Sequence, residues 1–141
     1  RSGENGSFFG FPAIGVDGVK VGRHAHFREP IDPNQPNPPV NDKDTDLLDG
    51  FIRRRLPAAA GLRVRSTTCR YTMLPSEDFL LDLLPNDKRI VVASPCSGHG
   101  FKFTSVVGEI LADLALEGGT ELPIGAFSFA AMDRFLAARA A

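Results

Sequence analysis

The hydrophobic pattern changes its period along the chain, and each period predicts a different kind of element. Apolar residues recur at helical spacing over residues 44–56 and 103–117, which predicts two amphipathic helices. The pair Gly118-Gly119 follows the second helix and predicts its end. Ser128 is placed to cap a third helix over residues 130–140. The chain is therefore expected to contain three helices of ordinary length.

Short runs rich in β-branched and aromatic residues predict strands between these helices. Residues 8–11 and 19–21 flank Gly15-Val16-Asp17-Gly18, and Asp-Gly between two strand-like runs is a hairpin signal. Residues 61–73, 79–84 and 89–94 are separated by turn-forming residues at 76–78 and 85–87, which predicts a three-stranded antiparallel meander. We therefore expect an α+β fold.

Prolines and charged residues predict the structure of the first helix and of the loop before it. Residues 29–42 contain five prolines, a density that leaves only an extended loop. Asp44 or Thr45 can cap the helix that follows, and three arginines at 53–55 crowd its C-terminal end. This arginine run is better explained by the helix dipole than by contact with nucleic acid.

Composition narrows the class of protein. The 141 residues are 43% hydrophobic and carry a net charge of −1, so the chain can bury one core and makes no electrostatic case for nucleic acid or an anionic membrane. Two cysteines and the lack of a long apolar run point to a soluble protein of a reducing, cytoplasmic compartment. Because the chain does not begin with Met and soon enters an apolar run, we interpret it as a fragment of a longer protein.

The stretch with the most chemical potential joins the strand at 89–94 to the helix at 103–117. A strand, a glycine-containing turn and a helix N-terminus together form a site for an anionic or electron-rich group, because the first-turn amides and the helix dipole point at it. Gly98 and Gly100 would let a ligand approach the backbone, and Lys102 adds a positive charge. The alternative is a plain strand-to-helix connection with a surface lysine.

Other reactive residues have equally plain alternatives. Lys20 is either a solvated strand lysine or a cation lining a wet cavity. Cys69 by composition is a small buried hydrophobe, and nothing in the sequence pairs it with Cys96. His24 and His26 would share a strand face if the strand continued, but a metal site would need a further ligand such as Cys96, so we expect no metal.

Three strings are more specific than their spacing. Residues 97–103 read Ser-Gly-His-Gly-Phe-Lys-Phe, residues 67–72 read Thr-Thr-Cys-Arg-Tyr-Thr, and residues 18–24 read Gly-Val-Lys-Val-Gly-Arg-His. With Gly-Phe-Pro at 10–12 and Ile-Asp-Pro at 31–33, they resemble the monomeric sarcosine oxidase and N-methyltryptophan oxidase family. The resemblance runs in one consistent order over nearly the whole chain.

The resemblance implies an FAD-dependent oxidase of a secondary amino acid, N-methyl or cyclic, with oxygen as acceptor and hydrogen peroxide as product. By position, Lys20 matches a lysine that promotes reaction with oxygen, and His24 matches a histidine near the substrate amine. Tyr71 and Lys102 match residues that hold the substrate carboxylate, and Cys69 matches the cysteine that carries the flavin covalently through a thioether. The residues matching the flavin-contacting turn are Gly98, His99, Gly100, Phe101 and Lys102.

The resemblance also implies a domain division and a missing partner. Residues 1–60 would belong to the substrate-binding domain and residues 61–141 to the C-terminal part of the FAD-binding domain, whose helix follows the glycine turn. The fingerprint Gly-x-Gly-x-x-Gly for the ADP half of the cofactor is absent here, as are the N-terminal arginines of the carboxylate clamp, so an upstream part of the same protein must supply them. The isolated chain is expected to be inactive.

One residue departs from the family's pattern, and two alternative functions remain open. Phe9 stands where the better-known sarcosine oxidases carry a tyrosine beside the substrate, which leaves the substrate undefined. The enzymatic alternative is a related dehydrogenase that passes electrons to another acceptor. The alternative from another class is a non-catalytic binding domain that keeps the fold without the cofactor.

Overall fold

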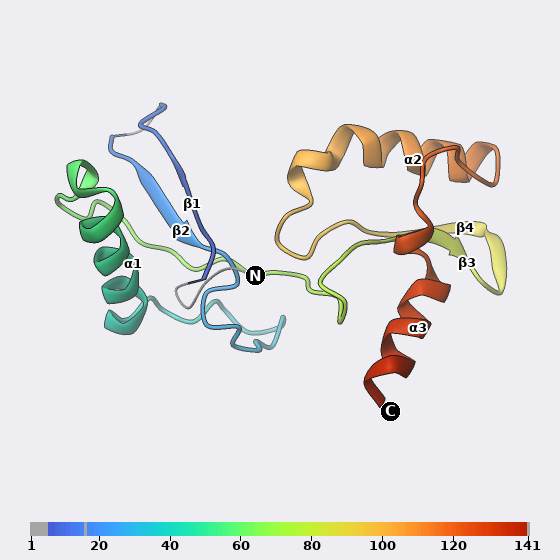
Figure 1. Ribbon diagram of the computed structural model, residues 1–141, viewed down its shortest axis with the longest axis horizontal. Coiled ribbons are helices and arrows are strands. Elements are labelled where there is room, and N and C mark those ends of the chain that lie inside the picture. The colour runs from blue at the N-terminus through green and yellow to red at the C-terminus, as the bar shows by residue number, and fades with distance from the viewer. Residues whose placement is uncertain (1–5, 16, 141) are drawn as a thin grey trace. The chain divides into compact units, whose positions relative to one another are not determined.

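The chain divides into two compact units, residues 1–70 and residues 71–141, each containing helix and a two-stranded antiparallel sheet. A computed structural model describes residues 6–15 and 17–140 (Figure 1). The expected α+β class is confirmed at this level. Within the described ranges, no helix combines the length and apolar character that a membrane crossing requires.

The first unit begins with a β-hairpin. Strand β1 (Phe8–Phe11) pairs antiparallel with β2 (Lys20–Arg23), in a register that sets Phe11 opposite Lys20. The predicted hairpin is confirmed, although the residues between the strands form a longer loop than a two-residue turn. Val16, in the middle of that loop, lies outside the described residues, while Gly15 and Gly18 take left-handed φ angles of 68° and 89°.

The helix of the first unit starts earlier than the sequence indicated. Helix α1 (Asp42–Arg55) is capped by Asn41, so the predicted caps Asp44 and Thr45 are wrong. The Asn41 side chain accepts from the Asp44 amide at 3.3 Å, and the Asp44 carboxylate accepts from the Asn41 amide at 3.0 Å, which forms a reciprocal capping box. The apolar side of α1 packs on the hairpin, where the Phe8 and Phe51 rings stack with centroids 3.8 Å apart. A short 3₁₀ helix, Pro57–Ala59, follows α1.

The strand predicted at 61–73 is wrong. The chain there is extended, but in the part of the chain that the structure describes it pairs with no other strand. Leu62 and Val64 are 93% and 73% exposed, so their alternation with arginines does not mark a buried face. Alternation predicts an extended backbone, whereas a strand also needs a hydrogen-bonding neighbour, which alternation cannot specify. The expected meander is consequently a two-stranded hairpin.

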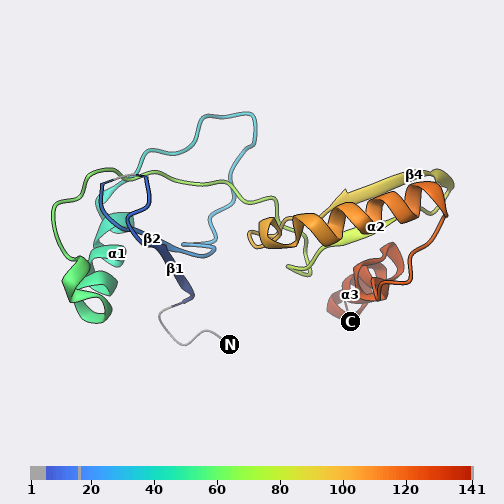
Figure 2. The same ribbon diagram turned by 90° about the horizontal axis from the view of Figure 1, so that it is seen from above.

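The second unit is built on that hairpin. Strands β3 (Leu80–Leu84) and β4 (Asp87–Ser94) pair antiparallel, and helix α2 (Thr104–Leu116) lies along them (Figures 1 and 2). Helix α3 (Phe129–Ala140) starts where Ser128 caps it, since the Ser128 hydroxyl accepts from the Ala131 amide at 3.2 Å. Short 3₁₀ helices occupy Phe101–Phe103 and Gly125–Phe127.

Alternation along β3 creates the core of the second unit. Leu81 and Leu83 point to one face and are buried against α2, while Asp82 points to the other and accepts a hydrogen bond from the Phe129 amide at 3.0 Å. The buried apolar residues are Phe79, Leu81, Leu83, Val107, Ile110 and Leu114. This core holds the end of β4 and the start of α2 in place, and therefore fixes the turn between them.

Candidate functional site

The turn between β4 and α2 contains most of the predicted flavin-contacting residues. Ser97 and Gly98 take left-handed φ angles of 45° and 76°, and the His99 amide donates to the Cys96 carbonyl at 3.1 Å. The Phe103 amide then donates to the Gly100 carbonyl at 2.9 Å, which starts the 3₁₀ turn that leads into α2. Two consecutive left-handed residues reverse the chain within a few positions and aim it into the helix.

Ser97 anchors this turn from inside, a role that the sequence analysis missed. Its side chain is 1% exposed, and its hydroxyl donates to the Asp78 carbonyl at 2.6 Å. The same hydroxyl accepts from the Leu74 amide at 3.4 Å, and the Ser97 amide donates to the Thr72 carbonyl at 2.9 Å. The structure thereby brings the segment that follows Tyr71 beside the glycine turn. A small polar residue directly before a left-handed glycine was the available signal.

His99 is committed to the turn itself. Its Nδ1 lies 2.9 Å from the Ser97 carbonyl oxygen, and its ring stacks on Phe79 with centroids 4.9 Å apart. Because a carbonyl oxygen only accepts, Nδ1 carries a proton. The imidazole therefore closes the turn and covers the core, while the His99 amide is held by the Cys96 carbonyl.

Gly100 has a structural reason to be glycine that differs from the one expected. Its backbone, at φ −76° and ψ −25°, is one that any residue adopts. A Cβ atom at this position would lie 1.6 Å from the Pro95 carbonyl oxygen. The close approach that Gly100 permits is thus made by the chain's own peptide. Gly98, in contrast, is required by its left-handed φ.

The far side of the turn is open and positively polarised. Lys102 is exposed at the start of the helical run, and Phe101 is 95% exposed. The 3₁₀ turn Phe101–Phe103 runs directly into α2, so the Thr104 amide donates to the Phe101 carbonyl, and the N-cap residue Phe103 adds no side-chain cap. An exposed ammonium at the positive end of a helix dipole suits an anionic group, and the role expected for Lys102 stays a prediction.

The predicted residues of the hairpin lie in the first unit. Lys20 is exposed on β2, with its ammonium 5.7 Å from the centre of the Phe11 ring. Strand β2 ends at Arg23, so the condition under which His24 and His26 would share a strand face is not met. The His24 amide donates to the Ser7 carbonyl at 2.8 Å, whereas His26 contacts Asp44 at 2.9 Å. No cluster of three or more His, Cys, Asp or Glu suited to a metal occurs among residues 6–15 and 17–140.

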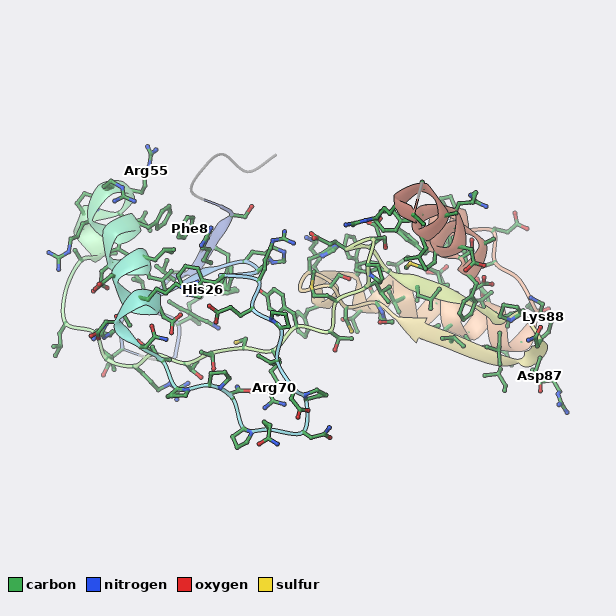
Figure 3. All side chains as sticks on the ribbon, turned by 90° about the horizontal axis from the view of Figure 1, so that it is seen from below. Phe8, His26, Arg55, Arg70, Asp87 and Lys88 are labelled. Atoms are coloured by element: carbon green, nitrogen blue, oxygen red, sulfur yellow. The ribbon has the colours of Figure 1, made fainter. Side chains whose placement is uncertain are left out.

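Cys69 is an exposed free thiol, which overturns its interpretation as a buried hydrophobe. Its neighbours bind the proline-rich loop: the Thr68 hydroxyl donates to the Pro38 carbonyl at 3.3 Å. The Arg70 guanidinium, labelled in Figure 3, donates to the Pro33 carbonyl at 2.7 Å. Arg70 also donates to the Gln35 carbonyl and to the Asn37 side chain. The segment is therefore held on both sides of the cysteine, while the sulfur stays accessible. Cys96 is likewise free and exposed.

Comparison with known proteins decides the family. Residues 4–114 match the model of the FAD dependent oxidoreductase family, DAO. The chain belongs to this family. It is 42% identical over 127 residues to monomeric sarcosine oxidase of Bacillus sp. (strain NS-129), an alignment that covers 89% of this chain and 33% of the relative.

Other members of the FAD dependent oxidoreductase family give the same picture. Monomeric sarcosine oxidase of Arthrobacter sp. (strain TE1826) is 39% identical over 125 residues, covering 87% of this chain and 32% of the relative. N-methyl-L-tryptophan oxidase of Yersinia pestis (strain Pestoides F) is 38% identical over 129 residues, covering 90% of this chain and 34% of the relative. The chain thus spans about a third of the length of the curated relatives it matches.

The described residues fit the flavin that this family name implies. An accessible thiol at Cys69 is chemically able to form a thioether, and no disulfide consumes it. The exposed Lys102, at the positive end of the α2 dipole, provides a donor and a positive charge for an electron-rich ring edge or an anionic group. Cys69 belongs to the first unit and Lys102 to the second.

Proposed function

We propose that the complete protein containing this chain is an FAD-dependent oxidase of a secondary amino acid, such as sarcosine, that uses oxygen as acceptor and releases hydrogen peroxide. The observation that carries this proposal is the 42% identity to a monomeric sarcosine oxidase over 89% of the chain. Residues 1–60 would serve the substrate-binding domain and residues 61–141 the FAD-binding domain. An upstream part of the same protein would bind the ADP half of the cofactor, and the free thiols agree with a cytoplasmic site of action.

The overall reaction balances without a strong base from the chain. The substrate loses a hydride and a proton to become an imine, which water hydrolyses, and the two electrons and two protons reduce oxygen to hydrogen peroxide. When bound, FAD supplies the two-electron acceptor between substrate and oxygen. The chain has to bind the amino acid, hold its amine in the reactive orientation and stabilise charge.

Lys102 and Tyr71 are proposed to bind the substrate carboxylate. Lys102 is exposed just before the start of α2, where its charge adds to the helix dipole. A phenol hydroxyl supplies a directional donor, and an ammonium supplies a strong charge-assisted hydrogen bond. The bond from the Ser97 amide to the Thr72 carbonyl supports this pairing, because it ties the residue after Tyr71 to the turn before Lys102.

Lys20 and His24 are proposed to serve the reacting centre. An ammonium group near oxygen would stabilise negative charge as oxygen is reduced, which is the physical reason for Lys20. His24 would hold the substrate amine by a hydrogen bond. Both belong to the hairpin edge formed by β2 and the turn after it, so one rigid element would position them together.

Cys69 is proposed to attach the flavin covalently. Forming the thioether removes one hydrogen from the thiol and one from the 8α-methyl group, and oxygen takes up the two electrons and two protons. The accessibility of the thiol supports this role. The extended segment held at Thr68 and Arg70 would keep the sulfur in place for the bond.

The proposal is tested on the complete protein, produced with flavin available. We expect a yellow protein that stays yellow after acid precipitation and that releases hydrogen peroxide with sarcosine or another N-methyl amino acid. Cys69→Ser should lose the acid-stable colour, whereas Cys96→Ser, the matched cysteine control, should keep it. Colourless protein would refute the flavin assignment. Amine oxidation without release of hydrogen peroxide would show that the electron acceptor is not oxygen.

A further inference from the structure

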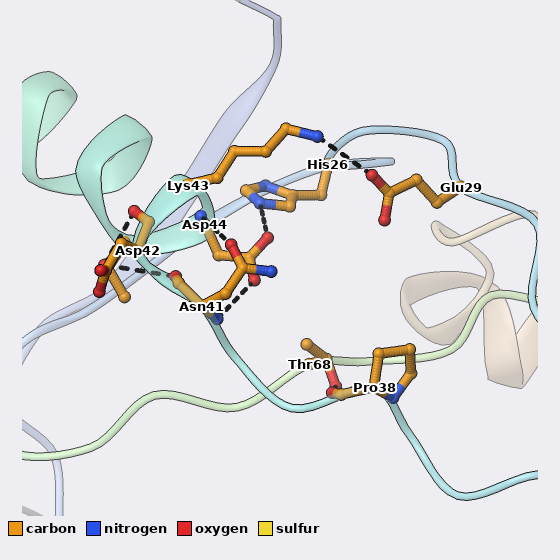
Figure 4. A network of polar contacts seen from close by, with 9 residues as sticks. His26, Glu29, Pro38, Asn41, Asp42, Lys43, Asp44 and Thr68 are labelled. Atoms are coloured by element: carbon orange, nitrogen blue, oxygen red, sulfur yellow. Dashed lines mark hydrogen bonds and ion pairs between the residues drawn. The ribbon is translucent and has the colours of Figure 1, made fainter.

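A side-chain contact joins the turn after β2 to the first turn of α1. His26 Nε2 lies 2.9 Å from Asp44 Oδ1, and the two side chains are 30% and 16% exposed. The other carboxylate oxygen, Oδ2, accepts from the Asn41 amide at 3.0 Å (Figure 4). Asp44 therefore serves two partners at once: it closes the capping box of its own helix and holds a histidine eighteen residues earlier in the chain.

The direction of the His26 hydrogen bond follows from the state of Asp44. The Asn41 amide bond, assisted by His26 and Lys43 and opposed by burial, holds the pKa of the Asp44 carboxyl below its usual range. The carboxylate is therefore ionised at neutral pH and can only accept, so His26 Nε2 carries the proton of this bond. Both a neutral imidazole with its proton on Nε2 and a protonated imidazole can donate this hydrogen bond to Asp44.

The turn that contains His26 is strained and closely tied. Ala25 takes a left-handed φ of 48°, unusual for a residue with a Cβ atom, and the Arg28 amide donates to the Ala25 carbonyl at 3.0 Å. On one side of Ala25, the His24 amide is fixed to the Ser7 carbonyl at 2.8 Å. On the other side, His26 is fixed to α1. A left-handed alanine persists only where its neighbours are held from both sides.

Other charged groups surround the contact without replacing it. Lys43, on α1, pairs with Glu29 at 3.1 Å and lies 3.9 Å from the centre of the Phe27 ring. Lys43 and Glu29 are 62% and 67% exposed, so their ion pair contributes little. The guanidinium of Arg23, the last residue of β2, lies 5.8 Å from the centre of the same Phe27 ring. The less exposed His26–Asp44 contact is the stronger constraint on the turn.

We propose that His26 is a positioning residue for His24: through its bond to Asp44 it holds the turn after β2 in the one conformation that orients the His24 side chain. This inference rests on the proposed function, in which His24 holds the substrate amine. It assigns to His26 a role different from metal binding. It also makes the N-terminus of α1 part of the apparatus that supports the active site.

The test compares variants of the complete protein by steady-state kinetics and by NMR of the histidine side chains. His26→Ala should lower kcat about tenfold with KM less affected, because a small displacement of a positioned group costs up to about a hundredfold in rate. His26→Gln, which keeps a side-chain N–H, should recover most of the loss. Flavin content should stay unchanged in both variants.

The NMR readout is independent of turnover. The His24 ring signals should shift in His26→Ala and in Asp44→Asn, and the double variant should shift no further. Lys43→Gln is the control from the same helical turn and should leave kcat and the His24 signals as in the unmodified protein. Unchanged His24 signals in His26→Ala, or an equal loss in Lys43→Gln, would overturn the inference. A protein without oxidase activity would refute the proposed function, while the NMR result would still decide whether His26 positions His24.

Discussion

Replacing Gly100 by alanine separates two explanations for the glycine, one structural and one based on ligand approach. The added Cβ would lie 1.6 Å from the Pro95 carbonyl oxygen and 2.7 Å from the Pro95 carbonyl carbon. Carbon-to-oxygen contacts ordinarily lie at roughly 3.3 Å or more, so one of the two peptides must move by about 1.7 Å. Backbone strain at Gly100 itself is not involved, because its φ of −76° suits alanine.

The magnitude follows from what the moving peptide is attached to. Pro95 is followed by Cys96, whose carbonyl accepts from the His99 amide, and then by Ser97, whose amide donates to the Thr72 carbonyl. Neither neighbour is a flexible side chain that could rotate away. Overpacking typically costs about 1–3 kcal/mol, and we expect Gly100→Ala to reach the upper end, about 3 kcal/mol. That corresponds to a change of roughly a hundredfold in the unfolding equilibrium.

The assay is denaturant unfolding of the complete protein, combined with amide hydrogen exchange at Ser97, His99 and Phe103, which report directly on the turn. Gly108→Ala is the matched control: Gly108 lies inside α2 with nothing within 4 Å of its added Cβ. Alanine there should stabilise by roughly 0.5–1 kcal/mol. If Gly100→Ala keeps normal stability and exchange but loses flavin, the contact with Pro95 is not the reason for the glycine, and ligand approach is.

Two further predictions concern carboxylates. Asp82→Ala removes the acceptor of the Phe129 amide, so the first turn of α3 should lose about 1 kcal/mol of protection, as when a cap is lost, and amide exchange there should speed up while that of α2 does not. Asp44 has a lowered pKa in the folded protein, so its contribution to stability is complete above the ordinary carboxyl value of 3.8 and is lost as pH falls through its folded value. The stability difference between the unmodified protein and Asp44→Asn should accordingly shrink below pH 3.8; a difference that stays constant down to acid unfolding would contradict the sign.

Elements with local signals could be predicted from the sequence. The α2 helix was found to within its terminal residues because apolar spacing, a glycine stop and the preceding turn all lie within its own segment. The start of α1 was misplaced because Asn41 stood at the edge of a proline-rich loop, where the capping box Asn41-x-x-Asp44 was overlooked. The helix itself is predicted correctly, and only its first residues are misplaced.

The strand predicted at 61–73 failed for a different reason. Alternation of Leu62 and Val64 with arginines describes a backbone that is extended, and the backbone is extended. What holds this segment, however, is a set of side-chain bonds from Thr68 and Arg70 to a loop thirty or more residues earlier. No periodicity of one segment can reveal a partner of that kind, because the partner loop has no period of its own.

The sequence of the glycine turn, residues 97–103, also leaves part of its structure unpredicted. Residues 97–103 lie within the stretch that matches the family, yet the structure assigns several of them to the turn itself: Ser97 to buried hydrogen bonds, His99 to the Phe79 ring, and Gly100 to the Pro95 carbonyl. Much of the specificity of this string therefore comes from the narrow turn, whose geometry restricts these few positions. Phe101 and Lys102 are exposed and their side chains do not build the turn, so under the proposed function their replacement should change ligand binding without changing the fold.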